Sequence, residues 1–131
     1  MADNRFKPYI LTRCDEVQPY RTRDGSLIRE LMHPEVHGNQ QVSVAEATIE
    51  PGAGTDLHIH HTSEEIYFVI QGAGIMTLGD EVFAIGRGDT VCINPKQPHR
   101  VENTGNLPLK ILCCCAPSYS HDDTEIIDEM V

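Results

Sequence analysis

Two histidines one residue apart, followed by a carboxylate, are the strongest chemical signal in this sequence. His58 and His60 lie on a stretch that reads as a strand, where side chains two residues apart point to the same face. A turn after His60 would bring Glu65 back beside them on the next strand. Two imidazoles and one carboxylate suit a borderline divalent ion such as Zn, Fe, Mn, Ni or Co. The pattern therefore predicts a metal site, and His99 is a fourth candidate ligand.

The same four groups have a second interpretation, as a polar, hydrogen-bonded interior of a barrel that holds no metal. Burying several ionisable groups together is costly without a cation, so metal binding is the favoured interpretation. Neutral imidazoles and a single carboxylate would leave a divalent ion with a net positive charge. They would also leave open coordination positions, which are typical of catalytic rather than structural sites.

Tyr67 lies two residues after Glu65 and is therefore expected on the same, inward face. Its phenol would lie near the metal as an acid, a base or a hydrogen-bond anchor, which makes Tyr67 a candidate catalytic residue. A tyrosine that only packs in the core fits the sequence equally well. His61 and Glu64 have the opposite parity and are expected to face solvent.

The elements that must position these residues read as short strands between frequent turn signals. Apolar runs at even spacing predict an all-β sandwich or barrel. The expected strands are 42–49, 65–70, 75–78, 82–85, 90–93 and 107–115. Residues 27–32 fit either a helical turn or an extended arm. Residues 1–131 are expected to form a single domain, with a barrel core at about 17–117 and polar N- and C-terminal extensions.

The residues reached so far resemble two sequence motifs of the cupin superfamily. In the second motif, Asn94 and Lys96 stand where the family has a proline and a glycine, so this motif is matched less fully than the first. Lys96 is expected to fit a turn built for glycine poorly. The residues that match are Gly52, His58, His60, Glu65 and Gly72 in the first motif, and Gly88, His99 and Asn103 in the second.

This resemblance implies a small cupin barrel, a jelly roll also called a double-stranded β-helix, with the metal near its centre. It implies a metal-dependent enzyme acting on a small organic substrate, with dioxygenase-like oxidoreductase chemistry favoured. Two alternatives stay open: a lyase or isomerase that uses Tyr67 as acid or base, and a non-enzymatic cupin that binds or senses a small molecule. Candidate side chains for an anionic substrate are Gln71, Arg87, Lys96, Arg100 and Asn103.

Charge and cysteine content restrict the partners. The net charge of −10 argues against nucleic acid and against anionic membrane surfaces. No apolar leader or membrane-length run is present, so a cytoplasmic location is expected.

Five cysteines, with Cys113, Cys114 and Cys115 consecutive, make a poor disulfide framework and read as packing residues. The acidic C-terminal residues read as a solvated tail, with folding back over the barrel as the alternative.

A homodimer is also expected. Ile66, Phe68 and Ile70 have the opposite parity to Glu65 and therefore point away from the metal side, where they need cover. In small cupins such a face is often buried against a second subunit. The alternative is that the chain's own ends, 10–17 or 126–131, cover it.

Overall fold

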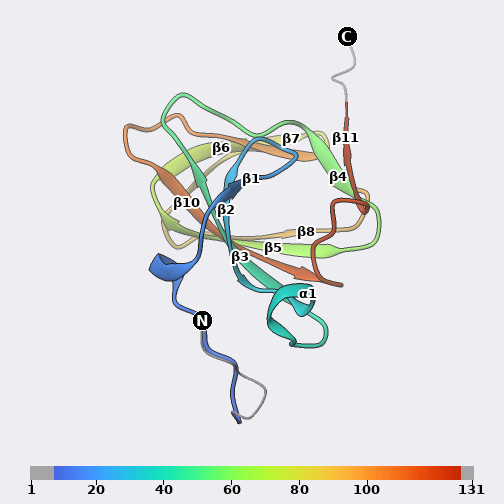
Figure 1. Ribbon diagram of the computed structural model, residues 1–131. Helices are drawn as coiled ribbons and strands as arrows, with labels where there is room; N and C mark the ends of the chain where they lie inside the picture. Colours follow the sequence, from blue (N-terminus) through green and yellow to red (C-terminus); the bar gives the residue numbers. More distant parts are fainter. Residues whose placement is uncertain (1–7, 128–131) are drawn as a thin grey trace.

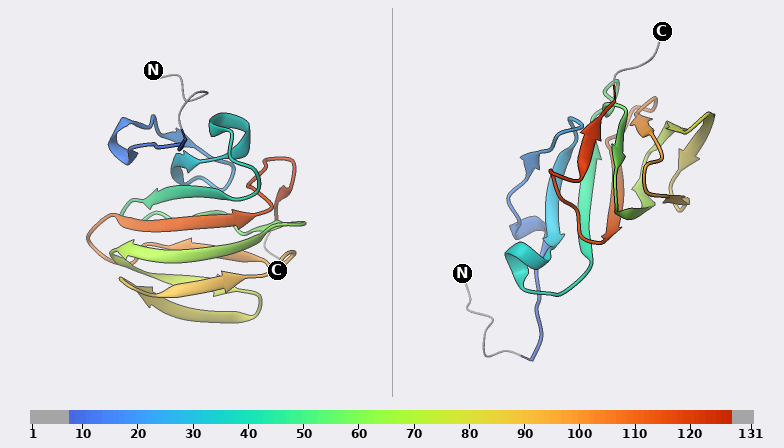
Figure 2. Two further views of the ribbon diagram at one scale, coloured as in Figure 1. Left: turned by 90° about the horizontal axis from the view of Figure 1, so that it is seen from below. Right: turned by 90° about the vertical axis from the view of Figure 1, so that its right-hand side faces the viewer.

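Two antiparallel sheets face each other in the computed structural model, which describes residues 8–127 (Figure 1). The larger sheet has the order β1-β2-β3-β10-β5-β8, and the smaller has the order β11-β4-β9-β6-β7. The strands are β1 (Tyr20–Arg21), β2 (Leu27–Met32), β3 (Ser43–Ile49), β4 (His58–His60), β5 (Glu64–Gln71), β6 (Ala73–Leu78), β7 (Glu81–Gly86), β8 (Thr90–Ile93), β9 (His99–Glu102), β10 (Leu109–Ala116) and β11 (Thr124–Ile126). Two short helical turns, η2 (Cys14–Glu16) and α1 (Pro34–His37), lie outside the sheets (Figure 2). None of the helices in residues 8–127 is long and apolar enough to cross a membrane.

Alternation along β5 explains how the sheets enclose a core. Glu65, Tyr67 and Val69 are buried between the sheets, whereas Phe68 and Ile70 are exposed on the other face. This is the period of two that a strand with one buried face requires. The buried apolar cluster comprises Ile49, Tyr67, Val69, Met76, Ile85, Ile93, Val101, Leu109 and Ile111.

The predicted all-β jelly-roll fold is confirmed, and each predicted strand overlaps an observed one. The segment left open, 27–32, is strand β2 and pairs with β3. The turn between β6 and β7 is a two-residue hairpin in which Leu78 pairs with Glu81. Lys96 has a φ of 67°, the left-handed conformation predicted to suit it poorly, and its backbone N–H donates to the His60 carbonyl at 2.7 Å.

The C-terminal segment folds back onto the barrel in the part that the structure describes, although Asp122 and Glu125 remain exposed to solvent as the solvated-tail interpretation expected. β11 pairs with β4, placing Thr124 opposite His60, and the red strand runs beside the green one in Figure 1. Asp123 accepts hydrogen bonds from the backbone N–H groups of Thr62 and Ser63. These contacts hold the pKa of Asp123 below its usual value, although burial acts in the opposite direction.

Candidate metal centre

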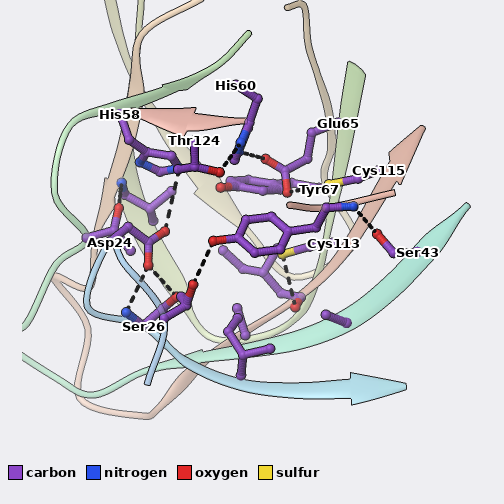
Figure 3. A pocket seen from close by; sticks show the side chains of 18 of the residues that line it. Asp24, Ser26, Ser43, His58, His60, Glu65, Tyr67, Cys113, Cys115 and Thr124 are labelled. Atoms are coloured by element: carbon purple, nitrogen blue, oxygen red, sulfur yellow. Dashed lines mark hydrogen bonds and ion pairs between the residues drawn. The ribbon is translucent and has the colours of Figure 1, made fainter. Parts of the chain in front are cut away.

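Three histidines converge between the two sheets. His58 and His60 lie on β4, and His99 lies directly opposite His58 on β9. One ligand atom of each imidazole lies within 4.8 Å of the others, and all three residues are buried. Figure 3 shows His58 and His60 pointing into the same space as Glu65 and Tyr67. The predicted convergence of His58, His60 and His99 is therefore present.

The hydrogen bonds of the Nδ1 atoms decide which nitrogen of each ring is free. Nδ1 of His58 lies 2.7 Å from the Asp56 carbonyl, and Nδ1 of His99 lies 2.9 Å from the Gln97 carbonyl. A carbonyl only accepts, so both Nδ1 atoms donate. Nδ1 of His60 lies 3.0 Å from Oγ1 of Thr124, whose own proton goes to the carbonyl of Ser120. In its neutral form each ring therefore presents an unprotonated Nε2, the form a metal ligand needs.

Glu65 adds a carboxylate at ligand spacing from two of the three histidines. Its Oε1 lies 3.1 Å from Nε2 of His60 and 3.4 Å from Nε2 of His99. Ligands about 2.1 Å from one ion are about 3.0–3.4 Å apart when they are neighbours in its shell. Within residues 8–127, Oε1 of Glu65 and Nε2 of His99 are buried and have no hydrogen-bond partner. Buried polar atoms are rarely left unpaired, so these residues fit a bound cation.

The electrostatics of the centre favour the metal-binding protonation states. Burial alone would raise the pKa of Glu65, but His60 and His99 in their protonated forms hold that pKa well below its usual value, an effect that a bound cation would supply once the rings are neutral. Burial, and then the nearby His99, lower the pKa of His58 to about 4, against the smaller opposing effect of Asp24. Glu65 is therefore ionised and His58 neutral near pH 7.

A second carboxylate approaches the histidines from the other side. Oδ2 of Asp24 lies 3.6 Å from Nε2 of His58 (Figure 3). Oδ1 of the same side chain accepts hydrogen bonds from the backbone N–H and the hydroxyl of Ser26, at 2.9 and 2.6 Å. The sequence marks Asp24 and Gly25 only as a turn, and no local signal indicates that this turn reaches the metal centre.

The consecutive cysteines alternate as predicted, and all five cysteines are free thiols. Cys113 and Cys115 line the cavity beside the histidines, while Cys114 pairs with Ile66 on the opposite face. Packing does not fully describe Cys115, because its thiol donates to Oε2 of Glu65 at 3.2 Å. Burial, followed by the charge of Glu65, raises the pKa of Cys115 well above its usual value, so the thiol stays protonated and acts as a donor.

Tyr67 lines the same cavity, as predicted, and is 5% exposed. Its ring lies 6.0 Å from that of His99, measured between centroids, and no hydrogen bond to its hydroxyl is found among the described residues. Burial, and then the charge of Glu65, raise its pKa well above the usual value, so the phenol is a proton donor near pH 7. The cavity measures about 50 Å³.

The rim of the cavity is built from segments far apart in the sequence. Tyr119, which precedes β11, packs its ring 5.8 Å from that of His60. Its hydroxyl lies 2.9 Å from Oγ1 of Thr22, which precedes Asp24 in the β1–β2 turn. Neither Tyr119 nor Thr124 was among the candidate site residues, because nothing local in the sequence places the tail beside β4.

The side chains considered for an anionic substrate are elsewhere, because none of them lines the cavity. Asn103 is buried, as its parity predicted, but its amide donates to the carbonyls of Ile49 and Leu107. Arg100 and Asn103 border a separate surface hollow. His61 faces outward, as expected, with Nε2 2.9 Å from a carboxylate oxygen of Glu125. The remaining candidates for binding an anionic substrate, Gln71, Arg87 and Lys96, also lie outside the cavity lining.

Comparison with known proteins agrees with this geometry. Residues 45–115 match the cupin domain. Uncharacterized protein MJ1618 of Methanocaldococcus jannaschii is 54% identical over 119 residues, which are 91% of this chain and 95% of that protein. A predicted oxalate decarboxylase of Thermotoga maritima superposes with a TM-score of 0.73 at 25% identity, over 82% of this chain and 99% of that one. The polyketide cyclase RemF of Streptomyces resistomycificus shares the fold, with a TM-score of 0.76 at 17% identity, over 91% of this chain and 85% of that one. With more than half of its length matched by this domain, the chain belongs to the cupin family.

Proposed function

We propose that this protein is a metal-dependent enzyme that acts on a small organic molecule in the cavity beside His58. His58, His60, His99 and Glu65 would hold one divalent transition metal ion. The observation that carries this proposal is the convergence of three buried histidines beside the unpaired Oε1 of Glu65, where His58, His60 and Glu65 also line a cavity. An ion held at the edge of open space keeps coordination positions for a substrate, as catalytic sites do.

Oxidoreductase chemistry of the dioxygenase type is the first candidate reaction. A bound divalent ion would act as a Lewis acid, or would activate O2 if it is redox-active. The protein's own contribution would be to orient the substrate and to exclude water. Burial of His60 and of Glu65, with Tyr119 packed beside His60, supports this role.

A lyase or isomerase is the second candidate, favoured by the Tyr67 hydroxyl. This hydroxyl is protonated, lines the cavity and has no hydrogen-bond partner in residues 8–127. It is therefore placed to donate a proton to a substrate atom that gains negative charge.

Metal analysis followed by activity screening tests both candidates. Natively purified protein should contain about one transition metal ion per chain by elemental analysis. The metal-loaded protein would then be screened for oxygen uptake and, separately, for anaerobic product formation with small phenols, enols, polyols and carboxylic acids. Metal-dependent oxygen uptake supports the oxidoreductase, and metal-dependent conversion without oxygen supports the lyase or isomerase. A ligand that binds tightly and is recovered unchanged would contradict the enzyme proposal in favour of a binding or sensor protein.

A further inference from the structure

The wall of the cavity carries carboxylates and no cationic side chain. Asp24, Glu30 and Glu65 all line it, and no lysine or arginine does among the residues that the structure describes. Two of these carboxylates point toward the metal-binding imidazoles from different sides: Glu65 approaches His60, and Asp24 approaches His58. Together they would cancel the charge of a divalent ion, so the centre would offer little attraction to an anion.

Hydrogen bonds fix the position of Asp24 beside His58. Its backbone carbonyl accepts from the N–H of Asp56 at 2.8 Å, and Ser26 donates twice to its Oδ1. Only Oδ2 is left, and it faces Nε2 of His58 at 3.6 Å. Because Nδ1 of His58 donates to the Asp56 carbonyl, that Nε2 carries a lone pair. Two acceptors that face each other need a cation or a donated proton between them.

A second, independent observation points to a ligand at this centre: one almost fully buried carboxylate oxygen, Oε1 of Glu65, has no hydrogen-bond partner among the described residues. Glu65 is 5% exposed, and its Oε1 has no hydrogen-bond partner among the described residues although it faces two imidazoles. Oδ2 of Asp24 lies beside His58, whereas Oε1 of Glu65 lies beside His60 and His99. A ligand bound there would meet the free oxygen of Asp24.

The mouth of the cavity is lined by hydroxyl groups. The hydroxyl of Tyr119 lies 2.9 Å from Oγ1 of Thr22, and the hydroxyl of Tyr20 donates to Oε2 of Glu30 at 3.2 Å. Burial raises the pKa of Glu30. Uncharged groups that donate and accept hydrogen bonds suit a ligand that is itself hydroxylated.

We propose that the cavity selects an uncharged ligand bearing an O–H group, whose proton is accepted by Oδ2 of Asp24, and that it disfavours carboxylates. The proposal rests on the metal-dependent function proposed above and adds the chemical class of the substrate. This preference would distinguish the cavity from a site that binds a dicarboxylate, because such a site would require a cation or a surplus of positive charge.

A pair of small probes tests this preference without knowledge of the natural substrate. Glycolamide is uncharged and carries an O–H group, whereas glycolate has nearly the same shape and a negative charge. Both would be titrated into cobalt(II)-loaded protein and followed by visible absorbance. The variant is Asp24→Asn, which keeps an oxygen for Ser26 and removes the charge. The matched control is Asp80→Asn in the exposed β6–β7 turn, which makes the same change outside the cavity lining.

Wild-type protein should prefer glycolamide, and Asp24→Asn should shift the ratio of the two affinities toward glycolate by about tenfold or more, since one negative charge beside the ligand is removed. Asp80→Asn should leave the ratio unchanged. If Asp24→Asn does not fold, Asp24→Ser, which also removes the carboxylate charge, should move the ratio in the same direction. An unchanged ratio in variants that bind cobalt would overturn this inference alone, whereas wild-type protein that takes up no cobalt would overturn the proposed function.

Discussion

Thr124→Val should separate the C-terminal segment's role at the metal centre from its role in the fold. Oγ1 of Thr124 accepts the Nδ1 proton of His60 and donates its own proton to the Ser120 carbonyl. Valine has nearly the same shape but neither function. The substitution therefore leaves the Nδ1 proton of His60 without an acceptor and no longer fixes that ring's orientation, while β11 can still pair with β4.

The expected effects follow from the loss of these two hydrogen bonds. Thr124 is 4% exposed, so no water replaces them easily. Losing them and leaving a buried N–H unpaired should lower the free energy of unfolding by about 2–3 kcal/mol. The hydrogen-bond partner of a ligating histidine is worth about 10- to 100-fold in metal affinity, so zinc affinity should fall by that factor.

Zinc affinity would be measured by competition with a chromogenic chelator, and stability by urea unfolding of the metal-free protein. Thr62→Val is the matched control, because Thr62 also ties the tail to the region beside β4, through a 2.8 Å hydrogen bond to Asp123. Thr62 is exposed and touches no ligand, so its loss should cost less than about 1 kcal/mol and leave zinc affinity unchanged. Equal zinc affinities for the two variants would refute the reasoning.

Four further predictions concern the metal, pH, Tyr67 and the exposed face of β5. A His58→Ala, His60→Ala double variant should lose stoichiometric metal, measured by elemental analysis, because two of the four proposed ligands are gone. In metal-free protein the free energy of unfolding should fall as pH drops from about 6.5 to about 4, by at most about 3 kcal/mol, since the unfolded chain protonates His58 first. Tyr67→Phe should retain metal and shift stability by about 1 kcal/mol or less, yet lower turnover about 100-fold if its proton is used. Light scattering should give a dimer mass, and Phe68→Glu should shift it toward the monomer, because Phe68 and Ile70 are 40% and 38% exposed.

Each of these predictions has a contrary outcome. Full metal retention in the double variant would reject the ligand assignment. A stability that does not change between pH 6.5 and 4, or an equal slope in His58→Gln, would show that His58 is not held neutral by burial. Unchanged turnover in Tyr67→Phe would reduce Tyr67 to a packing residue. A monomeric mass at micromolar concentration would contradict the dimer, and the described tail does not cover this face, because β11 pairs with β4 in the other sheet.

Local pattern was enough to identify two of the three histidines that could bind a metal. His58 and His60 share a face because a strand repeats every two residues, and Glu65 and Tyr67 share the next buried face for the same reason. The same alternation separated Cys114 from Cys113 and Cys115. These relations depend only on neighbours in the chain, so they can be read without knowing how the strands pair.

The remaining parts of the centre were decided by tertiary structure. Thr124 contacts His60 across 64 positions of sequence, and Cys115 contacts Glu65 across 50. Asp24 reaches His58 from a turn whose sequence predicts only a change of direction. Such contacts depend on which strands become neighbours and on how the two sheets stack, and many pairings bury similar apolar area. The sequence by itself therefore determined which residues can bind a metal, whereas the order of the strands decided which donors, and which second carboxylate, surround it.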